Sequence, residues 1–350
     1  MIIGIQGFSS FASQSTVNLT DAQSALTNYN RANPVAPRTG LPFSQFDYSS
    51  TSPSLSLSSP NLTLSVLGPS SYGDIRAALT NIGLQPGDVF TIGVRLSIAT
   101  AHANTQPVIG GFFSAGVTTA PTVPITHTDG STTLYVEFEV SRPDASTYRY
   151  KAWINGVSKL NTTSPGLYSN LAVGGSPLWK SSTNPPGNII LSDMYWAWNK
   201  DGQEERLGSC YVRQVPRDVI AGVGNPGAAE ATDITAQRAM WDLQSGSRPT
   251  PVTLSEPVVQ KSAINVNAST RVKAYSMTTI GKPSSSATPS RVTSQIIDDT
   301  DQVVASRSRE VSGSTYANGV LVTIVDVSSV PTDKLKQYKF VSSREKVTDV

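Results

Sequence analysis

The sequence has few of the residues that most often build catalytic and metal centres. It contains a single cysteine, Cys210, and two histidines, His102 and His127, in 350 residues. One thiol excludes an internal disulfide, and a cysteine-based zinc site needs several thiolate or imidazole ligands close together. Neither histidine stands in a pattern typical of a Ser-His-Asp triad. We therefore predict that the chain is not an enzyme and has no catalytic, cofactor-binding or metal-binding residues.

Charge and long apolar runs are also scarce. Charged residues make up 15 % of the chain, and the net charge is +2. A nearly neutral chain gives no electrostatic reason to expect a nucleic-acid partner. No run of about 20 apolar residues predicts a transmembrane helix, and the apolar residues 1–8 lack the basic start of a secretory signal. We expect synthesis in a bacterial cytoplasm and no membrane partner.

The chain is instead rich in the alternating patterns of β-strands. Apolar and other residues alternate over 134–140 and again over 148–154, and a long strand is predicted over 189–198. The pair Asn155-Gly156 follows the second run and predicts a hairpin, because both residue types accept positive φ. A further strand is predicted over 206–215. Short strands separated by frequent turn signals are typical of β-sandwiches.

We predict an all-β protein: a lectin-like jelly-roll sandwich and a second, smaller β-sandwich. The predicted parts are an N-terminal arm (1–47), the jelly roll (48–217), a linker (218–250) and the C-terminal sandwich (251–350). Residues 1–130 hold four basic residues and residues 251–350 hold twelve, which indicates two different surfaces. The arm packs on a neighbouring chain or on its own sandwich, or it is a mobile tail.

Only short helices interrupt the predicted strands. The first is expected over Asp21–Tyr29, after the capping residue Thr20 or Asp21. The second is expected over Asp74–Ile82, with Gly83 as its stop signal, and a third over Asp233–Leu243. Their apolar residues recur at helical spacing.

Several segments resemble bacteriophage virion proteins that carry a lectin-like jelly roll of the concanavalin or laminin-G type. The turn Gly83–Thr91 and the strand and hairpin Tyr148–Gly156 are similar to segments of those sandwiches. The pair Leu191–Trp196 and Arg206–Val212 is similar to the end of the same jelly roll. Residues 264–266 and 271–275 resemble, more loosely, the smaller sandwich that often follows. These are signatures of a fold and not of a reaction.

The resemblance implies a structural component of a phage virion, such as a tail, collar or capsid-decorating protein. Its partners would be other copies of itself and other virion proteins, and its location would be the virion. Closed homo-oligomers are the usual form of such parts. The main alternative is a receptor-recognition protein of the phage that binds a host surface glycan.

Three tryptophans are the candidate contact residues. Trp196 and Trp198 share one strand face by their spacing, and Trp153 is expected on a neighbouring strand. Aromatic faces can stack on the apolar faces of sugar rings, and Trp is also enriched at subunit contacts. The alternative, which we favour, is that they pack within the sandwich or at a subunit contact.

Two carboxylates provide a second alternative, a polysaccharide-cleaving glycosidase. Glu137 and Glu139 stand two apart on one strand, and their side chains lie about 7 Å apart on one face. Glycosidases use a carboxylate pair at about 5–10 Å. The competing and favoured interpretation is an ordinary outward strand face that bears two glutamates.

Overall fold

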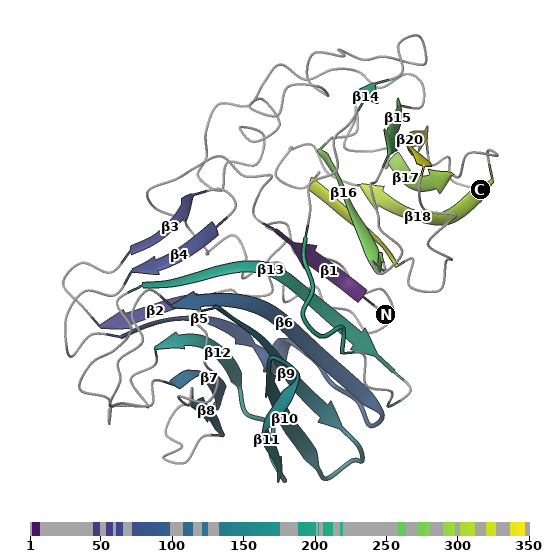
Figure 1. Ribbon diagram of the computed structural model, residues 1–350. Coiled ribbons are helices and arrows are strands. Elements are labelled where there is room, and N and C mark those ends of the chain that lie inside the picture. The colour runs from purple at the N-terminus through teal and green to yellow at the C-terminus, as the bar shows by residue number, and fades with distance from the viewer. Residues whose placement is uncertain are drawn as a thin grey trace. The chain divides into compact units, whose positions relative to one another are not determined.

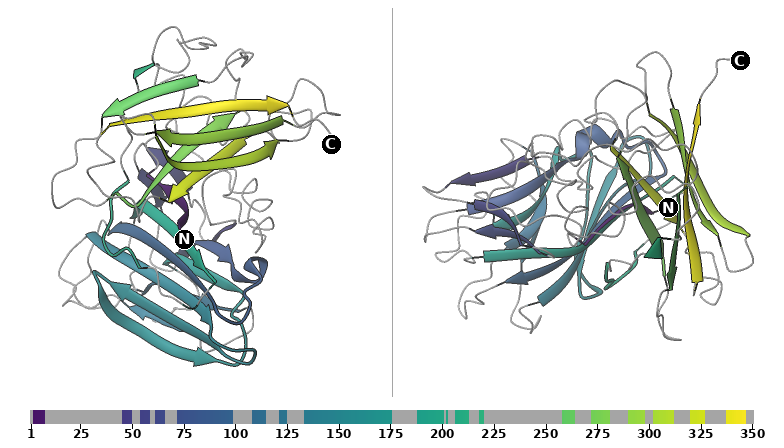
Figure 2. Two further views of the ribbon diagram at one scale, coloured as in Figure 1. Left: turned by 90° about the vertical axis from the view of Figure 1, so that its right-hand side faces the viewer. Right: turned by 90° about the horizontal axis from the view of Figure 1, so that it is seen from above.

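The computed structural model describes twenty strands and one short helix, and the chain divides into two compact units. Described are residues 2–7, 45–49, 54–58, 61–65, 72–98, 108–114, 121–124, 133–175, 188–200, 202, 206–212, 218–219, 258–263, 272–280, 290–297, 302–311, 320–326 and 337–346. The predicted helices over 21–29 and 233–243 lie outside them. Figures 1 and 2 show that both units are built from strands. The all-β prediction is confirmed.

The first unit comprises essentially residues 3–212 and contains two antiparallel sheets. The larger sheet has the order β11 (Val157–Ser164), β10 (Tyr148–Ile154), β9 (Thr133–Arg142), β6 (Asp88–Ile98), β13 (Asn188–Asn199), β4 (Asn61–Ser65) and β3 (Ser54–Ser58), and β1 (Ile2–Gln6) also pairs with β13. The smaller sheet has the order β2 (Gln45–Ser49), β5 (Tyr72–Ala78), β12 (Asn170–Gly175), β7 (Val108–Phe113) and β8 (Thr122–Pro124).

The core of this unit lies between the two sheets. Phe112 of β7 packs against Phe138 of β9 with ring centroids 6.0 Å apart, and against Tyr150 of β10 at 4.9 Å. Phe138 pairs with Ala152 on one side and with Ile92 on the other. Directly paired residues of antiparallel strands project to the same face, so this register defines the core face of the larger sheet. We call its opposite face the outer face.

The hairpin predicted at Asn155-Gly156 is confirmed. It joins β10 to β11, and its two residues have φ values of 49° and 82°. Such a pair of positive φ angles gives a tight turn whose twist matches that of the flanking strands. The backbone N–H of Asn155 also donates to the carbonyl of Tyr135 at 2.8 Å, which ties the turn to β9.

The helix predicted over Asp74–Ile82 is wrong for most of its length. Residues 72–78 form β5, which pairs with β12 on one side and β2 on the other. Ile75 and Ala77 are buried while Arg76 between them is less so, which is the period of a strand. Hydrogen bonding on both edges overrides the helical spacing of the apolar residues. Only the 3-10 helix η1 (Leu79–Ile82) remains, and it ends at Gly83 with φ 64° as predicted.

The beginning of the predicted N-terminal arm belongs to the first unit. Residues 2–6 are strand β1 and pair with β13. A Cβ atom on Gly4 would lie 1.9 Å from Cε2 of Trp196, so glycine allows this strand to pass close to the indole. Residues 8–44 of the arm lie outside the described residues, and the predicted domain boundaries remain predictions.

The second unit comprises essentially residues 213–242 and 246–350. Its five-stranded sheet has the order β14 (Asp218–Val219), β15 (Val258–Ala263), β20 (Gln337–Lys346), β17 (Ser290–Ile297) and β18 (Val303–Val311). Its two-stranded sheet consists of β16 (Ala274–Ile280) and β19 (Val320–Asp326). All pairings are antiparallel.

Candidate functional site

A row of four residues crosses the outer face of the larger sheet. Trp153 pairs with Glu137, Glu137 with Gly93, and Gly93 with Tyr195. The row therefore runs over β10, β9, β6 and β13 on one face. It places an indole, a carboxylate and a phenol side by side, with a glycine between the last two.

The glycine allows the phenol to reach the carboxylate. A Cβ atom on Gly93 would lie 2.1 Å from Cε1 of Tyr195, so the ring occupies the space above Gly93. The Tyr195 hydroxyl donates to Oε1 of Glu137 at 2.5 Å. Burial and the nearby carboxylate raise the pKa of Tyr195, so the phenol stays protonated and remains a donor.

A segment without regular structure, Arg206–Val212, crosses this face, and we call it the strap. Leu207 donates its backbone N–H to the Tyr195 hydroxyl at 3.1 Å, and Gly208 donates to Oε1 of Glu137 at 3.0 Å. Arg206 lies 3.7 Å from Oε2 of Glu137 and 4.2 Å from the centre of the Trp153 indole.

The strand predicted over 206–215 is therefore wrong in its described part. Residues 206–212 belong to no sheet, and Gly208 has φ 70°, outside the range of a strand. In a sheet, backbone N–H groups donate to a neighbouring strand. In the strap they donate instead to side chains of the sheet below. Residues 213–215 lie outside the described residues.

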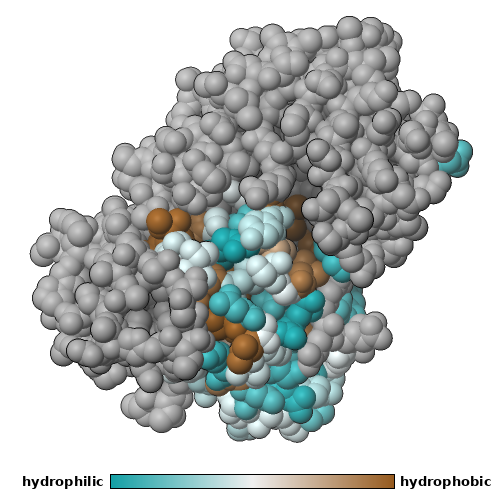
Figure 3. Space-filling view, in the orientation of Figure 1, coloured by the Kyte–Doolittle hydropathy of each residue, from teal (hydrophilic) through white to brown (hydrophobic). Residues whose placement is uncertain are grey.

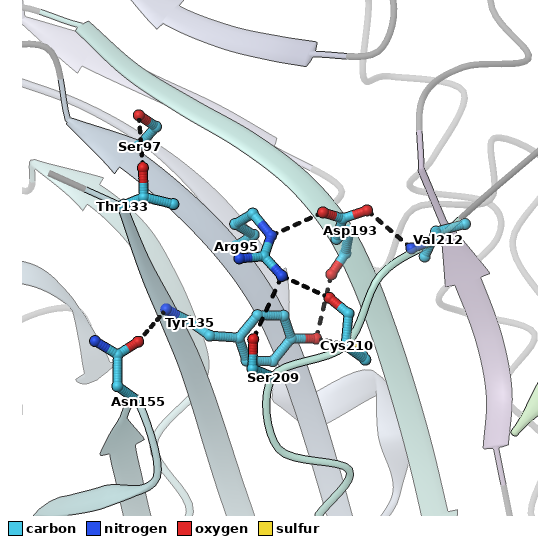
Figure 4. A network of polar contacts seen from close by, with 9 residues as sticks. All are labelled: Arg95, Ser97, Thr133, Tyr135, Asn155, Asp193, Ser209, Cys210 and Val212. Carbon is cyan, nitrogen blue, oxygen red and sulfur yellow. Dashed lines mark hydrogen bonds and ion pairs between the residues drawn. The ribbon is translucent and has the colours of Figure 1, made fainter. Parts of the chain in front are cut away.

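A second carboxylate holds the other end of the strap. Asp193 accepts hydrogen bonds from the backbone N–H of Val212 and from Nε of Arg95, both at 2.8 Å. Nη2 of Arg95 donates to the carbonyl of Cys210 at 2.8 Å and contacts the Ser209 hydroxyl at 3.4 Å. Figure 4 shows the guanidinium of Arg95 between the sheet and the strap.

Asp193 is positioned by an irregularity in β13. The register of β13 against β6 shifts between Ser192 and Tyr195, and Asp193 has φ 44°. Such a bulge inserts extra residues into one strand and redirects a side chain. Aspartate tolerates the left-handed region better than most residues because its short polar side chain can bond locally.

A small apolar cluster lies beneath the strap. Its buried members are Tyr135, Tyr195 and Ala197, and the partly buried Ile5, Leu207 and Cys210 pack against them. The Tyr135 hydroxyl donates to the carbonyl of Asp193 at 3.2 Å, so the Cys210 thiol, 2.7 Å away, is the donor to that hydroxyl. Burial raises the pKa of Cys210 to about 11 and also raises that of Tyr135.

The exposed part of this region carries one aromatic ring. Tyr211 is 63 % exposed, and the guanidinium of Arg95 lies 4.2 Å from its ring centre. Ser209 is exposed next to it on the strap. Asn155, in the hairpin turn, is also exposed, and its Oδ1 accepts a hydrogen bond from the backbone N–H of Tyr135. We call Asn155, Ser209 and Tyr211 the strap site.

The three tryptophans predicted as contact residues do not form one surface. Trp196 and Trp198 pair with Ile92 and Phe90 and lie on the core face, whereas Trp153 lies on the outer face. β10 and β13 are separated by two strands, so the expectation of neighbouring strands is wrong. All three side chains are buried, as in the favoured packing alternative. A glycan or subunit contact of these residues remains a prediction.

Glu137 and Glu139 share the outer face as predicted, but they do not face water. Each is 1 % exposed. Glu137 is bound by Tyr195, Gly208 and Arg206, and Oε1 of Glu139 lies 3.4 Å from Nζ of Lys151. The expectation of an ordinary solvated face fails because the outer face is itself covered. In this conformation, a glycosidic bond has no access to either carboxylate.

Local sequence patterns do not reveal the residues that build this site. Arg95 and Asp193 stand 98 positions apart, and no local spacing connects them. Tyr211 lies within the segment whose pattern predicts a strand. Within the described ranges, no group of three or more His, Cys, Asp or Glu side chains could hold a metal ion, and no helix is long and apolar enough to cross a membrane.

Figure 3 shows how polar and apolar residues are distributed on one side of the molecule. Hydrophilic and hydrophobic residues intermingle over the coloured part of that surface, and no single apolar patch dominates it. Such a mixture is the usual composition of a protein surface.

Comparisons with known proteins show similarity only at the level of structure. No protein-family model and no curated protein matches the chain. An alginate lyase, Aly36B, matches with 10 % identity and a TM-score of 0.32, covering 55 % of this chain and 95 % of that chain. A carbohydrate esterase from Shiga toxin-encoding bacteriophage phi24B matches with 8 % identity and a TM-score of 0.27, covering 53 % and 98 %.

Lectin I-B4 from Griffonia simplicifolia is a third similar structure. It has 10 % identity and a TM-score of 0.26, and the match covers 44 % of this chain and 93 % of the lectin. With TM-scores this low, none of these proteins supports an argument about the ligand or activity of this chain.

Proposed function

We propose that the first unit binds a carbohydrate at the strap site. The observation that carries this proposal is Tyr211, an exposed aromatic ring held in place by Arg95. An aromatic ring presents an apolar face on which the C–H groups of a sugar can stack. Tyrosine is enriched at binding contacts, where its apolar face and its hydroxyl can both be used.

The two other residues of the strap site are polar and suit the same ligand. Ser209 offers a hydroxyl and Asn155 an amide, and both are exposed. These groups donate and accept hydrogen bonds, as the hydroxyls of a sugar require. A few placed polar groups beside an aromatic surface are the usual composition of a small-molecule site.

The strap is also fixed before any ligand arrives. Glu137 binds Arg206 and Gly208 near one end, and Asp193 binds Val212 at the other. The exposed residues between these anchors therefore lose little conformational freedom on binding. Preorganisation of this kind increases affinity because less ordering accompanies association.

Truncation of the ring tests the proposal. The full chain would be screened against an array of oligosaccharides, and hits would be measured by titration calorimetry. Tyr211→Ala should weaken binding at least about tenfold, which corresponds to about 1.4 kcal/mol. Tyr148→Ala is the matched control. An arginine also lies against this ring, with Arg142 5.3 Å from its centre, but Tyr148 stands at the end of β10 that is away from the hairpin turn. Unchanged affinity of Tyr211→Ala would contradict the proposal.

A second candidate function is assembly into a virion, and one observation favours it. Strand β11 is an edge of the larger sheet, and Val157, Asn161 and Thr163 along it are exposed. An eight-residue edge strand presents backbone groups to which a strand of another chain can add. In this proposal the partner is another copy of the chain or another virion protein.

The oligomeric state tests the assembly candidate. Light scattering coupled to size exclusion should show an oligomer for the wild-type chain and a smaller species for Thr163→Lys, because lysine on an edge opposes strand addition. A wild-type monomer at every concentration would count against self-assembly through β11.

We do not propose cleavage of the glycan. The carboxylate pair that a glycosidase would use is buried and already bound within the protein. Bound oligosaccharide should therefore remain intact on prolonged incubation, as judged by mass spectrometry. Cleavage that is lost in Glu137→Gln would support the glycosidase alternative.

A further inference from the structure

We infer that the ligand of the strap site is a neutral sugar rather than an anionic one such as a uronic acid. The inference rests on the proposed carbohydrate binding and specifies its ligand class. The observation behind it is that the cations next to the site already bind carboxylates and carbonyl groups of the protein itself.

The guanidinium of Arg95 lies against the exposed ring and is already engaged by the protein. Nε binds the carboxylate of Asp193 at 2.8 Å, and Nη2 binds the carbonyl of Cys210 at 2.8 Å. Recognition of a ligand carboxylate by arginine normally uses two parallel N–H donors of one fork. Nη2 belongs to both forks of the guanidinium and already contacts the Cys210 carbonyl and the Ser209 hydroxyl, so neither fork offers two uncommitted nitrogens. Arg95 thus supports the ring of Tyr211 instead of receiving an anion in bidentate fashion.

The charge of Arg95 is also balanced where it stands. Asp193 is as little exposed as Arg95, with side-chain exposures of 15 % and 16 %. A ligand carboxylate approaching Tyr211 would meet the attraction of Arg95 offset by the repulsion of Asp193, whose carboxylate lies 2.8 Å from Nε of Arg95. The net electrostatic gain from this pair is therefore small.

The second nearby cation is balanced in the same way. Arg206 pairs with Glu137 at 3.7 Å and lies over the indole of Trp153. On the next row of the same face, Lys151 pairs with Glu139 at 3.4 Å. Each of these three cations has its own carboxylate, so the sheet beneath the strap does not act as a positive surface.

The exposed groups of the site are all uncharged. They are the phenol ring of Tyr211, the hydroxyl of Ser209 and the amide of Asn155. The exposed Arg149 lies far from these groups. It pairs with Ser141, which is about 20 Å along β9 from Tyr135. A uronate bound at the strap site would lose hydration of its carboxylate, and each of Arg95, Arg206 and Lys151 is already balanced by a carboxylate of the protein, so the exchange is unfavourable.

Matched pairs of oligosaccharides test the inference. Each pair has the same backbone and linkage and differs only at C6, which is an alcohol in one member and a carboxylate in the other. Affinities of the full chain would be measured by titration calorimetry in about 0.1 M and about 1 M NaCl. We expect the neutral member to bind at least about tenfold more tightly, with an affinity that changes little with salt.

A charge variant provides the second measurement. Asp193→Asn keeps an oxygen that can accept from Val212 and leaves the charge of Arg95 unbalanced. The ratio of the two affinities should move towards the uronate by several-fold, whatever the change in affinity for the neutral member. Circular dichroism and the melting temperature would confirm that the variant is folded.

The outcomes separate the two proposals. Equal affinity for both members, or tighter and salt-sensitive binding of the uronate, would overturn the neutral class while leaving carbohydrate binding intact. Binding that Tyr211→Ala does not weaken, or no binding to any member, would overturn the proposed function itself.

Discussion

The side chain of Tyr195 fills the space above Gly93, where a Cβ atom would lie 2.1 Å from the ring. The two residues are paired on adjacent strands, so this contact follows from the register of β6 and β13. It directs the phenol to the buried carboxylate of Glu137 and, through its hydroxyl, to the backbone of Leu207. The lack of a side chain at Gly93 thus determines how the strap is attached to the sheet.

Replacing Gly93 should therefore destabilise the first unit. In Gly93→Ala the methyl group and the Tyr195 ring compete for one space, and the expected cost is about 1–3 kcal/mol. Chemical denaturation followed by tryptophan fluorescence would measure it. Gly166→Ala is the control, because a Cβ atom there has no heavy atom within 4 Å. Equal stability of the two variants would contradict the contact.

Removing the Tyr195 hydroxyl should loosen the strap in particular. Tyr195→Phe deprives Glu137 of a donor and Leu207 of an acceptor in a buried place, with an expected loss of about 1–3 kcal/mol. Hydrogen exchange should accelerate at Leu207 and Gly208. Tyr150→Phe removes a hydroxyl bonded to Gly166 and Tyr168, so it should lower stability without changing exchange in the strap.

Cys210 should react slowly with thiol reagents while the protein is folded. Burial raises its pKa from 9.0 to about 11, and the reactive species is the thiolate. Near pH 8 the folded protein should thus react about a hundredfold more slowly than the same chain in denaturant. A rate in the folded protein equal to that in denaturant would contradict the buried position.

The raised pKa of Cys210 also makes the free energy of unfolding depend on pH. The folded state holds the thiol proton more tightly than the unfolded state, so this contribution is complete below about pH 9. It decreases as the pH rises from about 9 towards 11, and the raised pKa of Tyr135 acts in the same direction. Denaturation midpoints measured over this range should fall less in Cys210→Ser than in the wild-type chain.

The partner of Glu139 provides a further test. Lys151→Met removes the ammonium group that lies 3.4 Å from a carboxylate that is 1 % exposed. Breaking a buried pair on one side costs about 3–5 kcal/mol, because the remaining charge stays in the protein. Chemical denaturation of the wild-type chain and the variant would measure the loss. A loss under about 1 kcal/mol, the usual size for an exposed pair, would contradict the buried pair.

The sequence was informative wherever a local pattern determines structure. The hairpin at Asn155-Gly156 was predicted because both positions require positive φ, and the αL residue Gly83 was predicted as a stop signal. Strand periodicity likewise located most of β9, β10 and β13. The helix predicted over 74–82 is wrong for most of its length, because the spacing of its apolar residues fits both the helical and the strand period. Hydrogen bonding to β2 and β12 favours the strand.

The candidate site could not be predicted in the same way. Alternation along β9 indicates one face in contact with water, yet Glu137 and Glu139 on that face are both buried, and the strap binds Glu137. Burial of this kind depends on contacts between distant segments. The bulge at Asp193 has no local signal, and only the fold brings this residue to Arg95.

The most direct test of the central claim is hydrogen exchange of the full chain with and without the neutral oligosaccharide that it binds most tightly. The strap, residues 206–212, and the hairpin at Asn155-Gly156 should become protected on binding, and the protection should be lost in Tyr211→Ala. Protection confined to other segments, or none at saturating oligosaccharide, would contradict carbohydrate binding at the strap site.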